Sequence, residues 1–420
     1  MRGKSPDVAV IGAGVFGGWA AFHLLRLGAR VALIDAWPPG HSRGSSSDHS
    51  RILRCGYGAH ALYTDWAWRA RKLWLRYERE WKTPLFIPCG VLWLAPEETE
   101  YVKASLAAMS RWNIPVQKIP QKALAKATPQ MSVEDVRFAY FEIRAGVLRA
   151  RTAVETVARA VAGHPRGSLQ IAHAIAPVGA RHGVPEPDAR ARHAVPLQHV
   201  LLADGTKLAA GNFVFVCGPW LPQMFPTLLG ERIRVTKQEV FYFGPPAGDA
   251  RFNAPRLPAW IEIGASFYGI PSFGGYGLKV ADDTSTTLFE PTHGERAAAP
   301  ERLASARAYL ARRFPALADA PLSEARVCQY ERTPDSHLVI DRHPSFSNVW
   351  LAGGGSGHGF KLGPAVGEFV AHLVLDRESP SLGLARPRGV RDLREAIPAE
   401  LRLGAARFTD ASDISRLRSI

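Results

Sequence analysis

The sequence predicts an α/β fold in which a domain built on a parallel sheet is joined to a second domain with a large sheet of its own. Three observations support this prediction. An apolar strand enters a glycine-rich turn within the first twenty residues. Residues 233–290 contain several strand-like runs separated by glycine and proline turns. The chain has 420 residues, which is more than one hydrophobic core usually serves.

The start of the chain contains a complete strand–turn–helix–strand unit. A strand over residues 7–11 leads into Gly12-x-Gly14-x-x-Gly17, and a helix connects this turn to a second strand that ends at Asp35. In a dinucleotide-binding unit the first glycine permits the tight turn, the second lets the backbone approach a pyrophosphate, and the third lets the helix pack on the strand. The helix N-terminus offers free N–H groups to the phosphates. The pattern therefore predicts a nucleotide site.

Asp35 bears on which nucleotide is bound. A carboxylate at the end of the second strand can accept hydrogen bonds from both ribose hydroxyls. An acid there argues against a 2′-phosphate, so FAD or NAD is favoured over NADP. The alternative is that the glycines form only a tight turn in an ordinary α/β domain.

A second glycine-rich junction lies near the other end of the chain. An apolar strand begins at residue 349, and Gly354, Gly357 and Gly359 follow it before a helix over residues 364–375. A buried strand over residues 212–217 also ends in a glycine turn. Two strand-to-helix junctions at opposite ends of one chain are not typical of an NAD dehydrogenase. A flavoprotein would use the first for the pyrophosphate and the last to direct a helix N-terminus at the pyrimidine edge of the isoalloxazine.

The remaining elements are predicted from periodicity and turn residues. We expect helices over residues 63–81, 97–112, 120–127, 150–163 and 301–314, and strands within 86–94 and 136–148. The aromatic stripe of the first of these helices is predicted to lie in the core.

A long Pro/Gly/Ser loop follows Asp35 and ends at Arg51 and Arg54, whose spacing of three predicts one helical face. Loops of this length are often functional. Residues 177–196 read as a surface hairpin.

Bulk composition excludes several classes of protein. The net charge is +14, but the arginines are dispersed and no nucleic-acid-binding module is visible, so we expect a solvated basic surface and no nucleic-acid partner. No apolar run is long enough to span a membrane, and the first strand begins too early to leave room for a signal peptide, so a cytoplasmic location is expected. The four cysteines are scattered, so neither a disulfide framework nor a metal site is predicted.

With these motifs in place, the sequence resembles monomeric sarcosine oxidase and its relatives among the D-amino-acid-oxidase-like flavoproteins. The resemblance extends from Asp7 to about Asp376. Five ordered blocks carry it, at residues 12–17, 50–54, 268–279, 327–330 and 355–361. It implies a discontinuous FAD-binding domain with a Rossmann-like sheet and a substrate domain whose large mixed sheet covers the flavin. The FAD-binding domain would comprise residues 1–90, 146–225 and 325–385, the substrate domain residues 91–145 and 226–324, and a C-terminal extension residues 386–420.

The resemblance implies FAD as the cofactor, attached covalently through Cys328 to the flavin 8α-methyl. Because the thiolate is the attacking species, we expect Arg326, Arg332 or a helix end to lower the pKa of this thiol. The cofactor-binding residues implied are Gly12, Gly14, Val15, Phe16, Gly17, Asp35, Ser42, Ser50, Arg51, Cys328, Gly354, Gly357, His358, Gly359 and Lys361.

The same resemblance assigns roles around the flavin ring. Lys279 would activate oxygen, because a fixed cation stabilises superoxide as it forms. Arg54 and Lys361 would hold the substrate carboxylate and orient the α-carbon toward flavin N5. Arg51 would lie near the ring, and Tyr268, Tyr330 and His358 would line the pocket, with the backbone of His358 more important than its ring.

Three positions depart from the family pattern. Asp283 replaces a histidine that relatives have shortly after the oxygen-activating lysine, Ser47 replaces a histidine of sarcosine oxidase, and Trp260 replaces a smaller side chain beside the substrate. These differences argue against sarcosine itself as the substrate. Asp283 is expected to recognise an amine or a cationic side group.

The sequence therefore predicts an FAD-dependent amine oxidase. It would transfer a hydride from the C–N bond of a secondary, N-methyl or cyclic amino acid to flavin N5, giving an imine, and O₂ would be reduced to H₂O₂. The partners would be the small substrate and O₂, and the protein would be monomeric. Three alternatives remain open at this stage: a dehydrogenase that passes electrons to a protein or quinone, a biosynthetic oxidase of the desaturase type that acts on an imino acid, and a flavoprotein subunit that has lost turnover.

Overall fold

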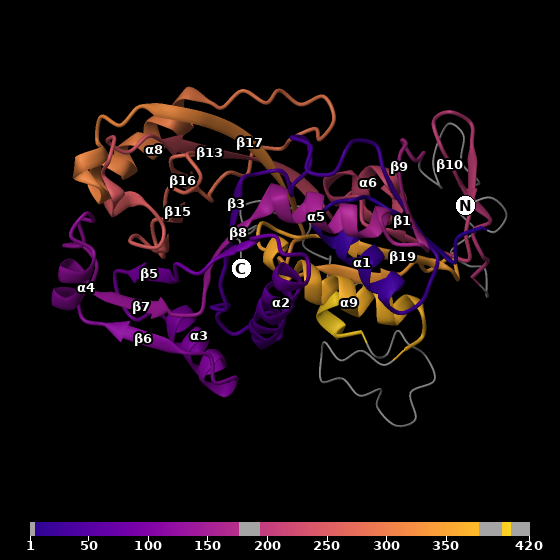
Figure 1. Ribbon diagram of the computed structural model, residues 1–420, viewed down its shortest axis with the longest axis horizontal. Helices are drawn as coiled ribbons and strands as arrows, with labels where there is room; N and C mark the ends of the chain where they lie inside the picture. The colour runs from indigo at the N-terminus through magenta and orange to yellow at the C-terminus, as the bar shows by residue number, and fades with distance from the viewer. Residues whose placement is uncertain (1–4, 176–193, 378–396, 405–420) are drawn as a thin grey trace.

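Two large sheets organise the molecule, as the sequence predicts. The computed structural model describes residues 5–175, 194–377 and 397–404. One sheet has six strands and the other has eight. In Figure 1 the eight-stranded sheet and α8 lie to the left, and the six-stranded sheet with its helices lies to the right.

The six-stranded sheet is the predicted nucleotide-binding unit. Five neighbouring strands run parallel, and the strand at one edge is antiparallel. β1 lies inside the sheet with β2 on one side and β12 on the other, so the strand order reverses at β1, which is where ligands bind in such sheets. The order is β18 (Val339–Arg342), β19 (Val349–Gly353), β12 (Asn212–Phe215), β1 (Val8–Ile11), β2 (Val31–Asp35) and β9 (Gly167–Ile171).

Three helices pack with this sheet: α1 (Val15–Arg26), α5 (Ala150–Ala162) and α9 (Gly363–Val374). Nearly every residue of α1 and α9 is buried. The two helices touch because Gly363 and Gly367 lie against Trp19. A Cβ on Gly367 would stand 2.5 Å from the backbone carbon of Trp19, so only glycine allows this approach.

α2 (Ala61–Glu80) carries the aromatic stripe that the sequence assigns to the core. Trp66 and Trp74 are fully buried and Tyr77 is nearly so, which confirms that prediction. Trp19 of α1 packs edge-on against Trp74, so the stripe joins α2 to the nucleotide-binding unit.

The eight-stranded sheet is mixed, since β14 pairs parallel with β5 and the other pairs are antiparallel. This confirms the predicted large mixed sheet. Its order is β17 (Leu322–Arg332), β13 (Arg234–Phe243), β16 (Leu278–Asp282), β15 (Phe267–Ile270), β14 (Ala259–Glu262), β5 (Val91–Ala95), β7 (Phe138–Glu142) and β6 (Val116–Ile119).

The two faces of this sheet have different neighbours because side chains alternate along each strand. Phe241, Val280 and Trp260 belong to an apolar cluster with α8 (Pro300–Arg313). Tyr242 lies directly across from Lys279 on the opposite face, where Cys328 also lies. That opposite face contributes to the cofactor cavity described below.

A small sheet corrects one prediction. Arg51 and Arg54 do not lie on one helical face, because β3 (Ser50–Leu53) pairs with β8 (Gly146–Arg149), which also pairs with β4 (Phe86–Ile87). Side chains three positions apart on an extended segment diverge, and the two arginines accordingly contact different residues. The next helix, α2, begins only at Ala61.

The shorter elements follow the sequence closely. The helices predicted near residues 97–112 and 120–127 are α3 (Glu100–Arg111) and α4 (Gln121–Ala127), and β10 (His199–Leu201) and β11 (Lys207–Ala209) form a separate pair.

The domain boundary predicted between residues 324 and 325 falls inside β17; the division into two domains stays a prediction. The hairpin predicted over 177–196 and most of the extension from 386 lie outside the described residues. Of the helices within the described ranges, none is both long enough and apolar enough to cross a membrane.

Candidate active site

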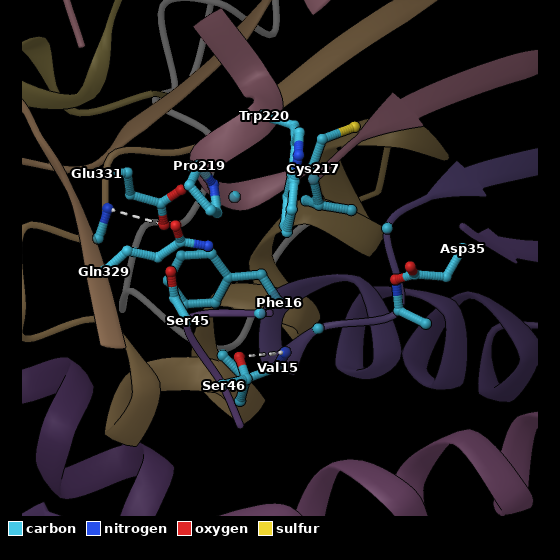
Figure 2. Close-up of a pocket in the computed structure, with 18 of the residues that line it drawn as sticks. Val15, Phe16, Asp35, Ser45, Ser46, Cys217, Pro219, Trp220, Gln329 and Glu331 are labelled. Carbon is cyan, nitrogen blue, oxygen red and sulfur yellow. Dashed lines mark hydrogen bonds between the residues drawn. The ribbon is translucent and has the colours of Figure 1, made fainter. Parts of the chain in front are cut away.

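A cavity of about 510 Å³ lies at the carboxyl ends of β1, β12 and β19, where the strand order of the six-stranded sheet reverses. Its wall combines the two glycine-rich junctions with residues of β17 from the other sheet. Figure 2 shows Val15, Phe16 and Asp35 on one part of this wall and Gln329 and Glu331 on another. The predicted cofactor residues that line it are Gly12, Gly14, Val15, Phe16, Asp35, Arg51, Gly357 and Gly359.

The first glycine turn has the geometry that a dinucleotide requires. Gly12 has a φ of +109°, and a Cβ there would stand 2.4 Å from the carbonyl oxygen of Val216. A Cβ on Gly17 would overlap the carbonyl oxygen of Gly12, so Gly17 sets the contact between helix and turn and does not itself line the cavity. Asp35 accepts hydrogen bonds from the backbone N–H groups of Ala13 at 2.6 Å and Trp37 at 3.1 Å, which hold its carboxylate at the cavity wall.

Several wall residues were not predicted from the sequence. Trp37 and Trp220 lie with ring centroids 5.1 Å apart beside Asp35, and they present aromatic surface at the ribose end of the cavity. Ser46 accepts a hydrogen bond from the N–H of Val15 at 3.2 Å, at the N-terminus of α1. The predicted Ser42 does not line the cavity, whereas Ser45, Ser46 and Ser47 do. The serine-rich loop is visible in the sequence, but the sequence does not reveal which of its serines face the helix.

A buried acid in the cavity wall was also missed. Glu331 is 7% exposed, its Oε1 accepts a hydrogen bond from Gly355 N at 3.3 Å, and Oε2 has no hydrogen-bond partner among the described residues. Burial raises the pKa of Glu331 to about 7, more than the Gly355 hydrogen bond lowers it. This carboxyl group can therefore be neutral near neutral pH and donate a hydrogen bond into the cavity.

A second, much smaller cavity of about 10 Å³ adjoins the first, since Arg51 and Tyr330 line both. Cys328 and Tyr268 also line it. The structure thus brings together four predicted site residues from β3, β15 and β17.

The environment of Cys328 differs from the one expected. The cation beside its sulfur is Arg51, whose Nη2 lies 3.9 Å from Sγ. Arg326 instead pairs with Glu324, and Arg332 donates a hydrogen bond to Thr236. Burial and the nearby Asp48 raise the pKa of the Cys328 thiol, and Arg51 and Lys279 offset this only in part. The expectation of a lowered pKa is therefore wrong for this arrangement of the protein.

Lys279 is buried on the cavity side of β16, and its ammonium donates a hydrogen bond to Asp48 Oδ2 at 2.5 Å. Asp48 also accepts hydrogen bonds from Arg51 at 2.6 Å and from the hydroxyl of Tyr242 at 2.5 Å. Burial alone would raise the pKa of Asp48, but Lys279 and Arg51 together bring it below its ordinary value. Sequence reasoning missed Asp48, since a single acid in a long loop carries no motif.

Lys361 and Arg54 meet at Tyr57. The Lys361 ammonium donates hydrogen bonds to the Tyr57 hydroxyl at 2.9 Å and to the His358 carbonyl at 2.8 Å. The Arg54 guanidinium lies 4.5 Å from the centre of the Tyr57 ring and 5.1 Å from that of Trp93. Burial, with Arg54 adding to it, lowers the pKa of Lys361 well below its ordinary value. Two predicted carboxylate-binding cations thus lie against the same buried tyrosine.

His358 contributes to this group of residues through its backbone. Its carbonyl accepts from Lys361, while its ring nitrogen Nε2 lies 2.9 Å from the carbonyl of Ser336, so Nε2 carries the proton. Burial and Lys361 lower the pKa of the ring well below its ordinary value. The imidazole is therefore neutral.

Two predicted substrate contacts have different outcomes. Trp260 is fully buried on the α8 side of its sheet, where its indole N–H donates to Tyr309 at 2.8 Å, so the structure does not bring it to the site. Asp283 follows β16, and its charge raises the pKa values of Tyr330 and Tyr268 after the larger effect of burial. It lies close enough to act on the pocket electrostatically. The predicted residues that line neither cavity are Gly17, Ser42, Ser50, Gly354, His358, Lys361, Arg54, Lys279, Trp260 and Asp283.

The fold and the glycine-lined cavity define an α/β protein of the dinucleotide-binding type, with a second sheet that contributes to the cavity wall. The chain belongs to the DAO family of FAD-dependent oxidoreductases, whose family model matches residues 7–373. This confirms the resemblance predicted from the sequence and the enzymatic class that it implies.

Curated relatives agree with this assignment. Monomeric sarcosine oxidase of Bacillus sp. (strain NS-129) is 31% identical over 375 residues, covering 88% of this chain and 92% of the relative. N-methyl-L-tryptophan oxidase of Yersinia pestis (strain Pestoides F) is 28% identical, covering 89% and 96%.

Solved structures share the fold. L-proline dehydrogenase from P. horikoshii superposes with a TM-score of 0.75 at 21% identity, covering 90% of this chain and 96% of that chain. Fructosyl amine:oxygen oxidoreductase (Amadoriase I) from Aspergillus fumigatus has a TM-score of 0.75 at 19% identity, covering 99% and 93%.

The cavity fits FAD in two respects that depend only on this chain. The Gly12 turn packs too tightly on the backbone of Val216 to admit a Cβ, and this path brings Gly12, Gly14 and the N-terminus of α1 to the cavity wall. Buried oxygen atoms of Gln329 and Glu331 in the wall have no hydrogen-bond partner among the described residues, so a ligand rich in hydroxyl groups can satisfy them.

Proposed function

We propose that the protein is an FAD-dependent oxidase of secondary, N-methyl or cyclic amino acids. The observation that carries the proposal is the pair of buried cationic groups beside the cofactor cavity: Arg54 with Lys361, and Lys279 with Arg51. The first group suits a substrate carboxylate and the second suits reduction of O₂. Bound FAD would supply the hydride acceptor and then pass the electrons to O₂, which becomes H₂O₂.

Arg54 and Lys361 would bind the substrate carboxylate. Arg54 offers a planar fork of donors and Lys361 a point charge. The depressed pKa of Lys361 supports this role, since an anionic ligand restores the favourable environment that burial removes. Anchoring the carboxylate fixes the α-carbon, so its C–N bond reaches the hydride acceptor in one orientation.

The substrate amine would react in its neutral form. The cations that bind the carboxylate disfavour a second positive charge nearby, so an amine that loses its proton on binding needs no dedicated base. Hydride loss from the neutral amine gives a protonated imine, which loses a proton to water to give the imine; the imine is then hydrolysed or tautomerised.

Asp283 would select among amines, as the departure from the family pattern suggests. Its effect on Tyr330 and Tyr268 indicates that its charge reaches the pocket. Turnover of a panel of amino acids with and without a cationic side group, by the wild type and by Asp283→Asn, tests this role. An unchanged order of preference would remove Asp283 from the proposal.

We also propose that FAD is attached through Cys328 by a thioether to the flavin 8α carbon. The sulfur lies in the small cavity that adjoins the main one, and Arg51 is positioned to stabilise the thiolate as it forms. A monomeric, cytoplasmic protein is the accompanying proposal. Its oligomeric state is supported by the similarity to monomeric sarcosine oxidase.

A dehydrogenase remains the second candidate, and one observation favours it. The fold is shared with L-proline dehydrogenase from P. horikoshii, so the fold by itself also suits an electron acceptor other than O₂. Rapid mixing of the reduced enzyme with air-saturated buffer separates the two functions. Slow reoxidation, together with fast transfer to a quinone, would favour the dehydrogenase.

The primary experiment is an anaerobic screen of amino acids and amines that follows the flavin absorption band at about 450 nm. A secondary or cyclic amino acid that bleaches this band supports the proposed function. Bleaching by none of them, in protein that holds flavin, would contradict it.

A further inference from the structure

A buried carboxylate joins the two cations on the oxygen side of the site. Asp48 is fully buried, and Lys279 is 1% exposed. One oxygen of Asp48 accepts from both Lys279 and Arg51, and the other accepts from Tyr242 and from the backbone N–H of His49 at 2.7 Å. Four donors on one carboxylate fix its position.

The backbone of the loop also holds Asp48 in place. Its carbonyl accepts a hydrogen bond from the N–H of Arg151 at 3.1 Å, at the start of α5. The loop is therefore anchored to the six-stranded-sheet side, while Lys279 belongs to the eight-stranded sheet. The ion pair between Asp48 and Lys279 therefore links this loop to the eight-stranded sheet.

The surroundings of Lys279 explain why a counter-ion matters. Its side chain is 1% exposed, and the rings of Tyr242 and Tyr268 lie 6.0 Å and 5.5 Å from its ammonium. A buried ammonium without an anion is strongly disfavoured and tends to lose its proton. Arg51 cannot help, because it is a second cation.

We propose that Asp48 is a positioning residue that keeps the Lys279 ammonium protonated and directed at the cofactor, so that Lys279 can promote flavin reoxidation. Two cations and one anion leave the cluster with one net positive charge. The role of Lys279 in flavin reoxidation rests on the proposed function, whereas the claim that Asp48 keeps Lys279 protonated does not.

Other titratable groups surround the Lys279–Asp48 pair, some of them through Arg51, Tyr268 or Tyr330, and must be considered in any pH profile. They come from the loop before β3, from β3 itself, from β13, β15 and β17, and from the segment after β16: Asp48, His49, Arg51, Tyr242, Tyr268, Cys328, Tyr330 and Asp283. Among them Asp48 is the acid that contacts Lys279 directly.

The test uses flavin-loaded enzyme reduced with light and no substrate, then mixed with O₂ at a series of pH values. Asp48→Asn should reoxidise about tenfold to a hundredfold more slowly than wild type at pH 9, the order of effect expected for one preorganised electrostatic contact, and should recover toward low pH. Because no amine is required, failure of the proposed amine oxidation cannot be confused with failure of this inference.

A double variant separates an effect through Lys279 from general damage. Lys279→Met should be slow and nearly independent of pH, and Asp48→Asn combined with Lys279→Met should be no slower than Lys279→Met alone. A spectroscopic readout accompanies this. The oxidised flavin spectrum of Asp48→Asn should show a pH transition that disappears in the double variant.

Two matched controls complete the design. Glu324→Gln removes a neighbouring carboxylate that bonds His49 but does not contact Lys279, and it should match wild type. Tyr242→Phe removes one hydrogen bond from Asp48 without changing its charge, and it should change the profile little. Wild-type reoxidation in Asp48→Asn at pH 9, or additive losses in the double variant, would overturn the inference.

Discussion

Lys361 donates a hydrogen bond to the hydroxyl of Tyr57 at 2.9 Å, across 304 positions of the sequence. Tyr57 comes shortly after β3 and Arg54, and Lys361 belongs to the last glycine junction. One contact therefore joins the two segments from which the proposed carboxylate site is built. The first predictions concern this site.

Lys361→Met should weaken binding of a carboxylate inhibitor. Loss of a hydrogen bond to a charged group removes about 2 kcal/mol, which corresponds to a dissociation constant about thirtyfold larger. Titration followed by the perturbation of flavin absorbance measures it. Lys361→Arg, which keeps the charge, should bind more tightly than Lys361→Met; equal affinities would argue against a charge contact.

Carboxylate binding should take up protons. The pKa of Lys361 is lowered by burial and by Arg54 in the free protein, and a bound anion raises it again. The affinity should therefore be highest where Lys361 is protonated and should fall as pH rises through the depressed pKa. Calorimetry in two buffers of different ionisation enthalpy measures the uptake, which should approach about one proton at pH values between the depressed pKa of the free protein and the raised pKa of the complex, and should vanish in Lys361→Met.

Glu331→Gln should stabilise the flavin-free protein at alkaline pH. The folded-state pKa of Glu331, about 7, is above the ordinary value of 4.5. The favourable contribution of the neutral group is complete below the unfolded pKa and is lost as pH rises through the folded pKa. The variant avoids this loss, which is at most about 3 kcal/mol.

Denaturant titrations of the flavin-free wild type and Glu331→Gln at pH 4.5 and pH 8.5 measure the difference. The gain in free energy of unfolding should be larger at the higher pH. A gain of equal size at both pH values would show that Glu331 is not the titrating group.

Cys328→Ser should release its flavin on acid precipitation, whereas wild-type precipitate should stay yellow. The reason is that serine offers no thiolate to form the proposed thioether. Cys217→Ser is the matched control, since Cys217 is also a free cysteine in the cavity wall but at a different part of it, and its flavin should remain attached. Wild-type protein that precipitates colourless would refute covalent attachment.

Trp260→Phe should lower stability without changing substrate preference. Trp260 is fully buried against α8 and donates to Tyr309, so the variant loses a hydrogen bond and part of its core contact, about 1–2 kcal/mol. Thermal unfolding and relative turnover of several amino acids measure the two effects. A changed order of substrates would contradict its placement in the core.

The parts of the fold that depend on local pattern were predictable. Gly12 has a positive φ and Gly17 packs on the carbonyl of Gly12 within one short strand–turn–helix unit, and the stripe containing Trp66 is read from helical spacing alone. The predicted helices and strands follow from the same kind of signal, whereas the mixed character of the large sheet was implied by the family resemblance.

What could not be predicted depends on pairing between distant segments. Arg51 lies on a strand because β3 pairs with β8, nearly a hundred residues later, and no local signal near Arg51 reveals that partner. Trp260 was assigned to the wrong face because the face depends on how β14 sits between β5 and β15. Asp48 was missed because its two cations come from β3 and β16.

The glycine contacts of Gly363 and Gly367 with Trp19 have a mechanical consequence. α1 begins at the turn expected to bind the pyrophosphate of the cofactor, and α9 follows the turn expected to lie at its ring end. Since the two helices interlock, their starting points cannot shift independently. A side chain that pushes the two helices apart would therefore displace both ends of the cofactor at once. A flavin without its adenylate half would lose one of these two linked binding turns.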